Sequence, residues 1–238
     1  MDDLKHCMIY KTPTATRPLL GMTILVVEDS RFACEALRLM CLRSGARIRR
    51  ADCLASARRH LRVYRPSAVI VDMGLPDGSG LDLISDLATA TPRVGVILGM
   101  SGDDEAEGRT LEAGADGFLA KPLETLASFQ EAVLAALPDE IKPEGPRGVV
   151  TDSVIPDRSA YRDDIAHVTS LLEMRQDGET LDYAAQFLRG VARSAHDRPL
   201  ESAAADLARC HPGGGGRRDM VARLMQLLHA RADSRAAI

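Results

Sequence analysis

The sequence predicts an α/β domain built on a doubly wound, five-stranded parallel sheet, followed by a small all-α domain. Between residues 22 and 137, short runs rich in β-branched residues alternate with segments of helical period, which is typical of βα units. Two of these runs, 68–71 and 94–98, are apolar without alternation, as expected for strands that helices cover on both faces. Beyond residue 158 only helical periodicity is found.

Five segments of the first part are predicted to be strands. In chain order they are Thr23–Val27, Ala46–Arg50, Ala68–Val71, Val94–Leu98 and Gly117–Leu119. The segments between them are amphipathic, and the first has one apolar stripe formed by Ala33, Ala36, Leu37, Met40 and Cys41. This spacing is that of a helix face turned toward a core, and Gly45 follows where such a helix should end.

The last part of the chain is predicted to be a small helical bundle. Four segments have helical period: Ser159–Gln176, Thr180–His196, Pro199–Cys210 and Arg217–Arg231. The second carries a full apolar stripe, made of Leu181, Ala184, Ala185, Leu188, Val191, Ala192 and Ala195. Amphipathic helices joined by short connections bury such stripes against one another.

Proline and glycine content divides the chain between these domains. Four prolines and two glycines fall between residues 138 and 157 without any regular period, which indicates a linker. Because Met22 directly precedes the first strand, the natural start is left open between Met1 and Met22. The predicted parts are a flexible tail at 1–21, the α/β domain at 22–137, the linker at 138–157 and the helical domain at 158–238.

Composition excludes several classes of protein. With 45% hydrophobic and 27% charged residues, the 238-residue chain matches an ordinary globular protein, and no apolar run reaches the length of a membrane span. The net charge is −4, and the part from Asp139 onward holds 14 Lys and Arg against 16 Asp and Glu, so no basic domain suggests nucleic-acid binding. Five cysteines without a CxxC pair argue against disulfides or zinc and favour the reducing cytoplasm.

Polar side chains follow four of the five predicted strands. Glu28 and Asp29 follow the first, Asp72 the third, Ser101 the fourth and Lys121 the fifth. Because the carboxyl ends of parallel strands meet at one edge, where ligands bind in doubly wound sheets, we expect these side chains to converge. Converging carboxylates repel one another unless a cation lies among them, and Mg²⁺ prefers such oxygen ligands.

These residue types together suit phosphoryl transfer. A carboxylate such as Asp72 can act as a nucleophile toward phosphorus, and the transferring group needs positive charge around its oxygens. Lys121, a hydroxyl donor at Ser101 and Mg²⁺ would supply that charge and a hydrogen bond.

The first domain resembles the receiver domains of two-component response regulators, which have a flavodoxin-like fold. Four runs carry the resemblance: Ile24–Ser30, Val71–Leu81, Met100–Gly102 and Gly114–Pro122. It implies phosphorylation of Asp72 by a histidine kinase or a histidine phosphotransferase. It also implies Mg²⁺ held by Asp29, Asp72 and the carbonyl of Gly74, with Glu28 acting mainly through water.

The same resemblance implies a conformational switch made of Ser101 and Phe118, in which the hydroxyl turns toward the phosphate and the ring follows inward. Gly102 stands where alanine is commoner in the family, and Gly74 offers the phosphate no side chain. These departures bear on the lifetime of the phosphorylated state. Receivers of this family often form homodimers, and the residues leave this open here.

Part of the helical domain resembles histidine-containing phosphotransfer domains, which are four-helix bundles. The run Gln186–Gly190 is similar to their His-x-Leu-Lys-Gly motif, with Gln186 in place of the histidine while Arg189 and Gly190 retain the cation and the glycine. An amide cannot accept a phosphoryl group as an imidazole can. We therefore expect Gln186, Arg189 and Gly190 to contribute to partner docking only.

The sequence thus predicts a cytoplasmic response regulator whose helical module works by protein contact. The alternative is a phosphorylation-controlled DNA-binding transcriptional regulator, but the net-acidic helical part with its scattered arginines has no helix-turn-helix spacing. The helical part also lacks a catalytic constellation, so no enzyme activity is expected. His167 and His196 lie outside any acceptor motif and are interpreted as solvated or capping side chains.

Overall fold

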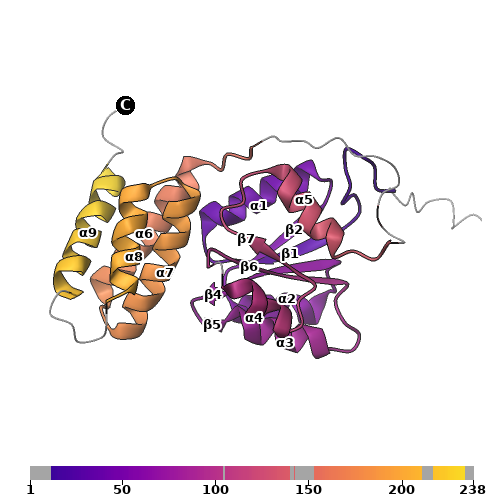
Figure 1. Ribbon diagram of the computed structural model, residues 1–238, viewed down its shortest axis with the longest axis horizontal. Coiled ribbons are helices and arrows are strands. Elements are labelled where there is room, and N and C mark those ends of the chain that lie inside the picture. The colour runs from indigo at the N-terminus through magenta and orange to yellow at the C-terminus, as the bar shows by residue number, and fades with distance from the viewer. Residues whose placement is uncertain (1–11, 104, 140–141, 143–152, 211–216, 234–238) are drawn as a thin grey trace, which may run out of the picture.

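A five-stranded parallel sheet forms the centre of the first domain in the computed structural model (Figure 1). The structure describes residues 12–103, 105–139, 142, 153–210 and 217–233. The sheet order is β2-β1-β3-β6-β7, and this topology confirms the predicted doubly wound fold. The strands are β1 (Thr23–Val27), β2 (Arg47–Ala51), β3 (Ala68–Asp72), β6 (Val96–Ser101) and β7 (Gly117–Ala120).

Helices cover both faces of this sheet. They are α1 (Arg31–Arg43), α2 (Leu54–Val63), α3 (Gly80–Thr89), α4 (Ala106–Glu112) and α5 (Leu126–Ala135). Alternate residues of β1 enter two separate cores: Ile24 and Val26 pack with α1 and α5, whereas Leu25 and Val27 pack with α2 and α3. Successive strand side chains point to opposite faces, so both faces of a covered strand must be apolar.

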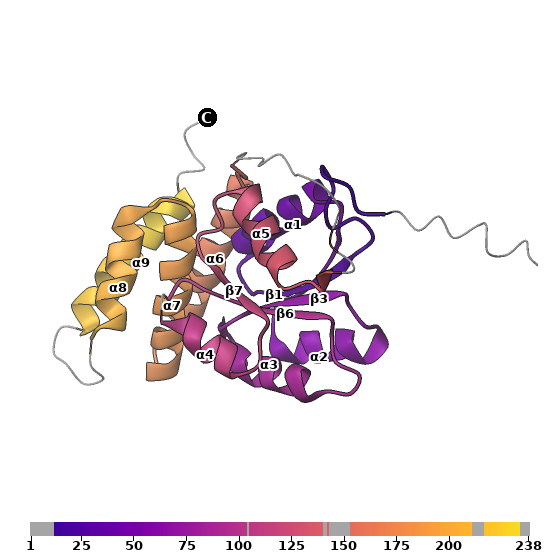
Figure 2. The ribbon, with the colours of Figure 1, turned by 45° about the vertical axis from the view of Figure 1, so that its right-hand side comes forward.

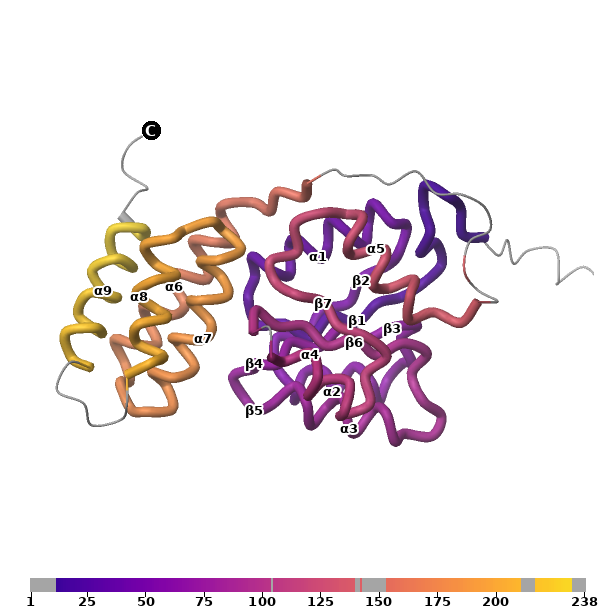
Figure 3. The backbone as a smooth tube through the Cα atoms, in the orientation of Figure 1, coloured from indigo at the N-terminus to yellow at the C-terminus, as the bar shows by residue number. Residues whose placement is uncertain are grey.

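Four helices follow and pack as a bundle around their own core. They are α6 (Arg158–Met174), α7 (Gly178–Ser194), α8 (Arg198–Ala208) and α9 (Arg217–Asp233). Figures 1, 2 and 3 agree that α6 and α7 lie beside the α/β domain, with α8 and α9 on the far side. Across the described ranges, no helix has the length and apolar character needed to cross a membrane.

Two features of the sheet region differ from the sequence prediction. The fourth strand runs from Val96 to Ser101 instead of Val94–Leu98, because pairing with β3 aligns Ala68 with Val96 and Asp72 with Met100. The ends of β6 are therefore set by its pairing with β3, which the composition of the segment does not reveal. After β3 the chain also forms a small antiparallel hairpin of β4 (Gly74–Leu75) and β5 (Gly78–Ser79), which was not predicted.

Parts of the predicted tail and linker pack on the α/β domain. Leu19 is fully buried in the core beside α1, and its N–H donates to the carbonyl of Ser44 at 2.9 Å, so the ordered domain begins before residue 22. Val154 of the predicted linker is buried in the same core, and Ser153 bridges to Thr125. Burial of apolar side chains fixes both segments. Residues 1–11, 140–141 and 143–152 lie outside the described residues.

Candidate functional site

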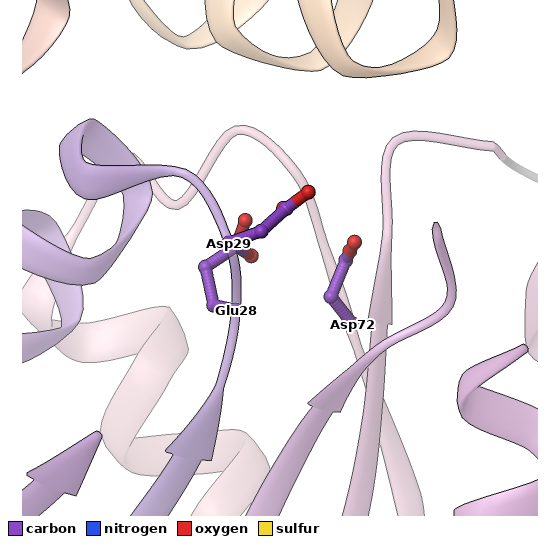
Figure 4. Close-up of side chains that lie close together, drawn as sticks. All are labelled: Glu28, Asp29 and Asp72. Carbon is purple, nitrogen blue, oxygen red and sulfur yellow. The ribbon is translucent and has the colours of Figure 1, made fainter. Parts of the chain in front are cut away.

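Three carboxylates gather at the carboxyl ends of two neighbouring strands. Glu28 and Asp29 follow β1 and Asp72 ends β3, and these strands pair in register from Ile24 to Val27. One oxygen of each carboxylate lies within 4.8 Å of the others (Figure 4). The structure therefore brings together the acidic residues that the sequence placed at strand ends.

Lys121 lies between two of these carboxylates. Its Nζ is 2.6 Å from Oε2 of Glu28 and 2.7 Å from Oδ1 of Asp72, and its side chain is only 10% exposed. Burial lowers the pKa of Lys121, but the charges of Asp72 and Glu28 outweigh this and raise it above its ordinary value. The ammonium group therefore stays charged beside the proposed acceptor.

The oxygen atoms of this cluster suit a hard cation. Burial raises the pKa of Glu28 well above its usual range and that of Asp29 to about 6, so the positive charge of Lys121 does not fully compensate the negative charges of these two carboxylates. Glu28 also accepts from the N–H of Ser30 at 3.1 Å, so the carboxylates of Asp29 and Asp72 are the candidate donors for Mg²⁺ in this cluster. The carbonyl of Gly74 is a donor only as the family resemblance implies. The residues fit a magnesium site.

The predicted switch residues lie on adjacent strands. Ser101 ends β6, is 7% exposed, and its Oγ accepts from the N–H of Asp103 at 3.1 Å. Phe118 lies half-buried in β7, paired with Gly99 of β6. Ser101 lines a cavity of about 80 Å³ together with Asp72 and Lys121, and Phe118 is not among its lining residues.

Helix α7 closes the other side of this cavity. Gln186, Arg189 and Gly190, the predicted docking residues, line it with Arg193, and Figure 4 shows helices of the bundle lying across the site from the carboxylates. The docking residues therefore face the chain's own acidic site. We had expected them to meet another protein.

Two hydrogen bonds join α7 directly to the site. The hydroxyl of Tyr183 donates to Oδ2 of Asp29 at 2.6 Å, and Nη1 of Arg193 donates to the carbonyl of Gly102 at 3.0 Å. Burial and the charge of Asp29 raise the pKa of Tyr183, so its hydroxyl remains a donor. One oxygen of a predicted metal ligand is thus already engaged by the bundle.

A buried aspartate of α6 anchors the bundle to the start of α1. Asp164 is 2% exposed and accepts three hydrogen bonds: from Oγ of Ser30 at 2.7 Å, from N–H of Arg31 at 2.8 Å and from N–H of Phe32 at 3.1 Å. The first turn of α1 contains no acidic residue of its own. The bundle therefore supplies the negative charge that a helix N-terminus favours.

Asp164 and Tyr183 were not identified from the sequence. The sequence did contain one signal for Asp164. It is an acidic residue on the buried side of α6, directly before Ile165 and four residues before Val168. A buried acid must find partners, but nothing in the spacing shows that they lie more than 130 residues away.

Comparison with known proteins matches the first domain. Residues 24–133 match the family model of the response regulator receiver domain. The KDP operon transcriptional regulatory protein KdpE of Escherichia coli is 31% identical over 99 residues, covering 42% of this chain and 44% of that protein. The virulence transcriptional regulatory protein PhoP of Salmonella typhimurium is 31% identical over 115 residues, covering 46% and 50%.

A solved response regulator from Chloroflexus aurantiacus is also similar. It is 32% identical, with a TM-score of 0.42, over 43% of this chain and 87% of that one. The chain spans about half the length of the curated relatives it matches. The family match ends at residue 133, before the helical bundle begins.

Proposed function

Because residues 24–133 form a receiver domain of the response-regulator family, we propose that this protein accepts a phosphoryl group on Asp72 and thereby controls the docking of its own helical bundle. The observation that carries this proposal is the shared cavity, which is lined by Asp72 and Lys121 on one side and by α7 on the other. A dianionic group formed there changes the environment of both domains.

The phosphoryl group would come from a histidine kinase or a histidine phosphotransferase. Asp72 acts as the nucleophile, Lys121 compensates the negative charge, and the Ser101 hydroxyl donates to a phosphoryl oxygen. Asp29, Asp72 and the Gly74 carbonyl would hold Mg²⁺, which would add positive charge near those oxygens when bound. Since α7 covers the cavity, a donor protein must displace the bundle, whereas a small phosphodonor needs only the cavity opening.

The contacts between the domains lie where phosphorylation acts. Tyr183 holds Asp29, and Arg193 holds Gly102, next to the switch residue Ser101. Movement of Ser101 and Phe118 toward the phosphate would shift Gly102 and weaken the contact of Arg193. Phosphorylation then favours release of the bundle, whose uncovered α6 and α7 surfaces contact a protein target.

Mass spectrometry of the full chain tests this proposal. After incubation with Mg²⁺ and acetyl phosphate, we expect a phosphoryl adduct on the wild type and on the exposed control Asp86→Ala, but none on Asp72→Ala. Hydrogen exchange of the Phe32 amide, which Asp164 now protects, should speed up in the phosphorylated form. An adduct on Asp72→Ala would instead place the acceptor elsewhere, with His167 and His196 examined first.

The names of the relatives favour a second candidate, a phosphorylation-controlled DNA-binding regulator. KdpE and PhoP are named transcriptional regulators, but the similarity covers about half of each. Fluorescence anisotropy of the phosphorylated full chain with duplex DNA over a salt series distinguishes the two. Salt-dependent binding would support this second candidate, and its absence would reject it.

A further inference from the structure

The side chain of Gln186 fills the space that a side chain at position 74 would occupy. A Cβ atom built on Gly74 would lie 2.3 Å from Nε2 and 2.9 Å from Cδ of Gln186. Gly74 is two residues from the proposed phosphoacceptor, and its N–H donates to Oδ2 of Asp72 at 3.1 Å. The absent side chain of Gly74 and the inserted amide of Gln186 are therefore complementary.

The exposed side chain of Gln186 lines the cavity that holds the acceptor carboxylate. It lines the same cavity as Asp72, Ser101 and Lys121, yet Gln186 is exposed whereas Asp72 is buried. Within the described ranges, the Gln186 side chain forms no hydrogen bond with another residue. Its carbonyl oxygen and its NH₂ group are thus both available to a water molecule entering from solvent.

We propose that Gln186 positions the water that hydrolyses the phosphoryl group on Asp72, so that the docked bundle resets the switch. This inference rests on the proposed phosphorylation of Asp72. An amide does not take up a proton or a phosphoryl group, but it can orient an attacking water in line with the bond that breaks, as glutamine does in GTP hydrolysis.

The reaction consumes one water and releases inorganic phosphate. The water oxygen forms a bond to phosphorus while the bond from phosphorus to Oδ of Asp72 breaks, and the electron pair of that bond returns to the carboxylate. The carbonyl oxygen of Gln186 accepts a hydrogen bond from the attacking water, and the proton that this water loses passes to a phosphoryl oxygen. Asp72 then again lies beside Lys121, as in the structure.

This role fits a bundle that is released by phosphorylation. Hydrolysis occurs whenever the bundle redocks, because only then does Gln186 reach the phosphate. The lifetime of the released state therefore depends on how often α7 returns to the cavity.

Decay of the adduct on the full-length protein tests the proposal. Wild type, Gln186→Ala, Gly74→Ala and the double variant are phosphorylated with acetyl phosphate and Mg²⁺, freed of the donor, and followed by intact mass. We expect Gln186→Ala to prolong the adduct lifetime roughly 10- to 100-fold, the size of effect that loss of positioning produces. The control is Glu179→Ala, which alters an exposed residue in the first turn of the same helix.

Gly74→Ala separates positioning from a merely structural role. The three heavy atoms nearest to the new methyl group all belong to the flexible end of Gln186, so the methyl group should displace the amide and prolong the adduct similarly. In the double variant the two effects should not add, because each removes the same interaction. Phosphorylation rates and Phe32 amide exchange should stay close to wild type in the control Glu179→Ala.

Three outcomes overturn the inference. If Gln186→Ala forms an adduct that decays at the wild-type rate, only this inference fails and the phosphorylation proposal stands. If releasing the bundle by Asp164→Ala shortens the adduct lifetime, the bundle shields the phosphate and does not promote its hydrolysis. If no variant, Gln186→Ala included, forms an adduct, the proposed function fails and this inference fails with it.

Discussion

The α/β domain and the helical bundle present opposite hydrogen-bonding groups where they meet. At the start of α1 in the α/β domain, the N–H groups of Arg31 and Phe32 donate hydrogen bonds to the carboxylate of Asp164 in the bundle. At the end of β1 the direction is reversed: the carboxylate of Asp29 in the α/β domain accepts a hydrogen bond from the hydroxyl of Tyr183 in the bundle. Such complementarity fixes one orientation of the two domains.

The two domains also differ in where their buried polar side chains find their partners. Glu28, Asp72 and Lys121 pair with one another inside the α/β domain, so that site is complete without the bundle. Among the described residues, the side chain of Asp164 finds its hydrogen-bond donors, and that of Tyr183 its acceptor, on the α/β domain. The carboxylates and the lysine of the candidate site thus all come from the α/β domain, whereas Asp164 and Tyr183 form their hydrogen bonds between the two domains.

Removing the lysine of the α/β site should have the largest effect. Lys121→Met leaves Glu28 and Asp72 buried without their cation, which is expected to lower the free energy of unfolding by about 3–5 kcal/mol. Urea denaturation measures this, and Mg²⁺ should restore part of the loss. Lys142→Met, which breaks a pair with the exposed Asp139, should cost far less, because solvent screens the charges of an exposed pair. Equal losses in both variants would contradict the assignment of a buried pair.

Removing the anchor of the bundle should have the next largest effect. Asp164→Ala leaves the N-terminal N–H groups of α1 without their acceptor and should weaken docking by about 2–5 kcal/mol. Hydrogen exchange of the Phe32 amide reports the change. The matched control is Asp163→Ala, whose exposed pair with Arg31 contributes about 0–1 kcal/mol. If the Phe32 amide exchanges equally fast in both variants, Asp164 does not anchor the bundle.

Removing the hydroxyl of Tyr183 should have a smaller effect, which concerns both the docking of the bundle and the affinity for Mg²⁺. Tyr183→Phe deletes the hydrogen bond to Asp29, so docking should weaken by about 0.5–1.5 kcal/mol. Because the freed oxygen becomes available to a cation, the affinity for Mg²⁺ should rise, by at most about tenfold for an energy of this size. Titration calorimetry measures the affinity. Tyr161→Phe, whose hydroxyl donates to Asp197 within the bundle, should leave Mg²⁺ binding unchanged.

The smallest effect is expected at Gly190 of α7. A Cβ atom there would meet nothing within 4 Å, so Gly190→Ala should stabilise the helix by about 0.5–1 kcal/mol. Thermal unfolding of the full chain, compared with wild type, measures the gain. A loss of stability would show instead that this glycine permits a close approach that the present docking does not use.

Local patterns in the sequence predicted most of the α/β domain. Apolar strands, amphipathic helices and polar residues at strand ends each follow from short-range periodicity, and the predicted Thr23–Val27 is β1 as observed. Strand ends were less well predicted: β6 begins two residues later than expected. Its ends depend on hydrogen bonding to β3, which no single segment encodes.

The helical part shows where such reasoning stops. Its apolar stripe was predicted, and six of the seven expected residues are buried, with Ala195 partly exposed and Phe187 added. The polar face of α7 gave no comparable information, because a solvated face and a docked face have the same composition. Gln186 was singled out by its motif, but its position against Gly74 was not predicted.

Patterns along the chain were enough to predict the two folds and the set of chemical groups, because secondary structure and cores arise from the period of apolar residues. The tertiary structure alone decided that the bundle covers the acidic site, that Asp164 caps α1 and that Gln186 enters beside Asp72. These contacts join residues 112 to 154 positions apart. They depend on how the two folded domains dock. Complementary shape and charge select that arrangement only after each domain has folded.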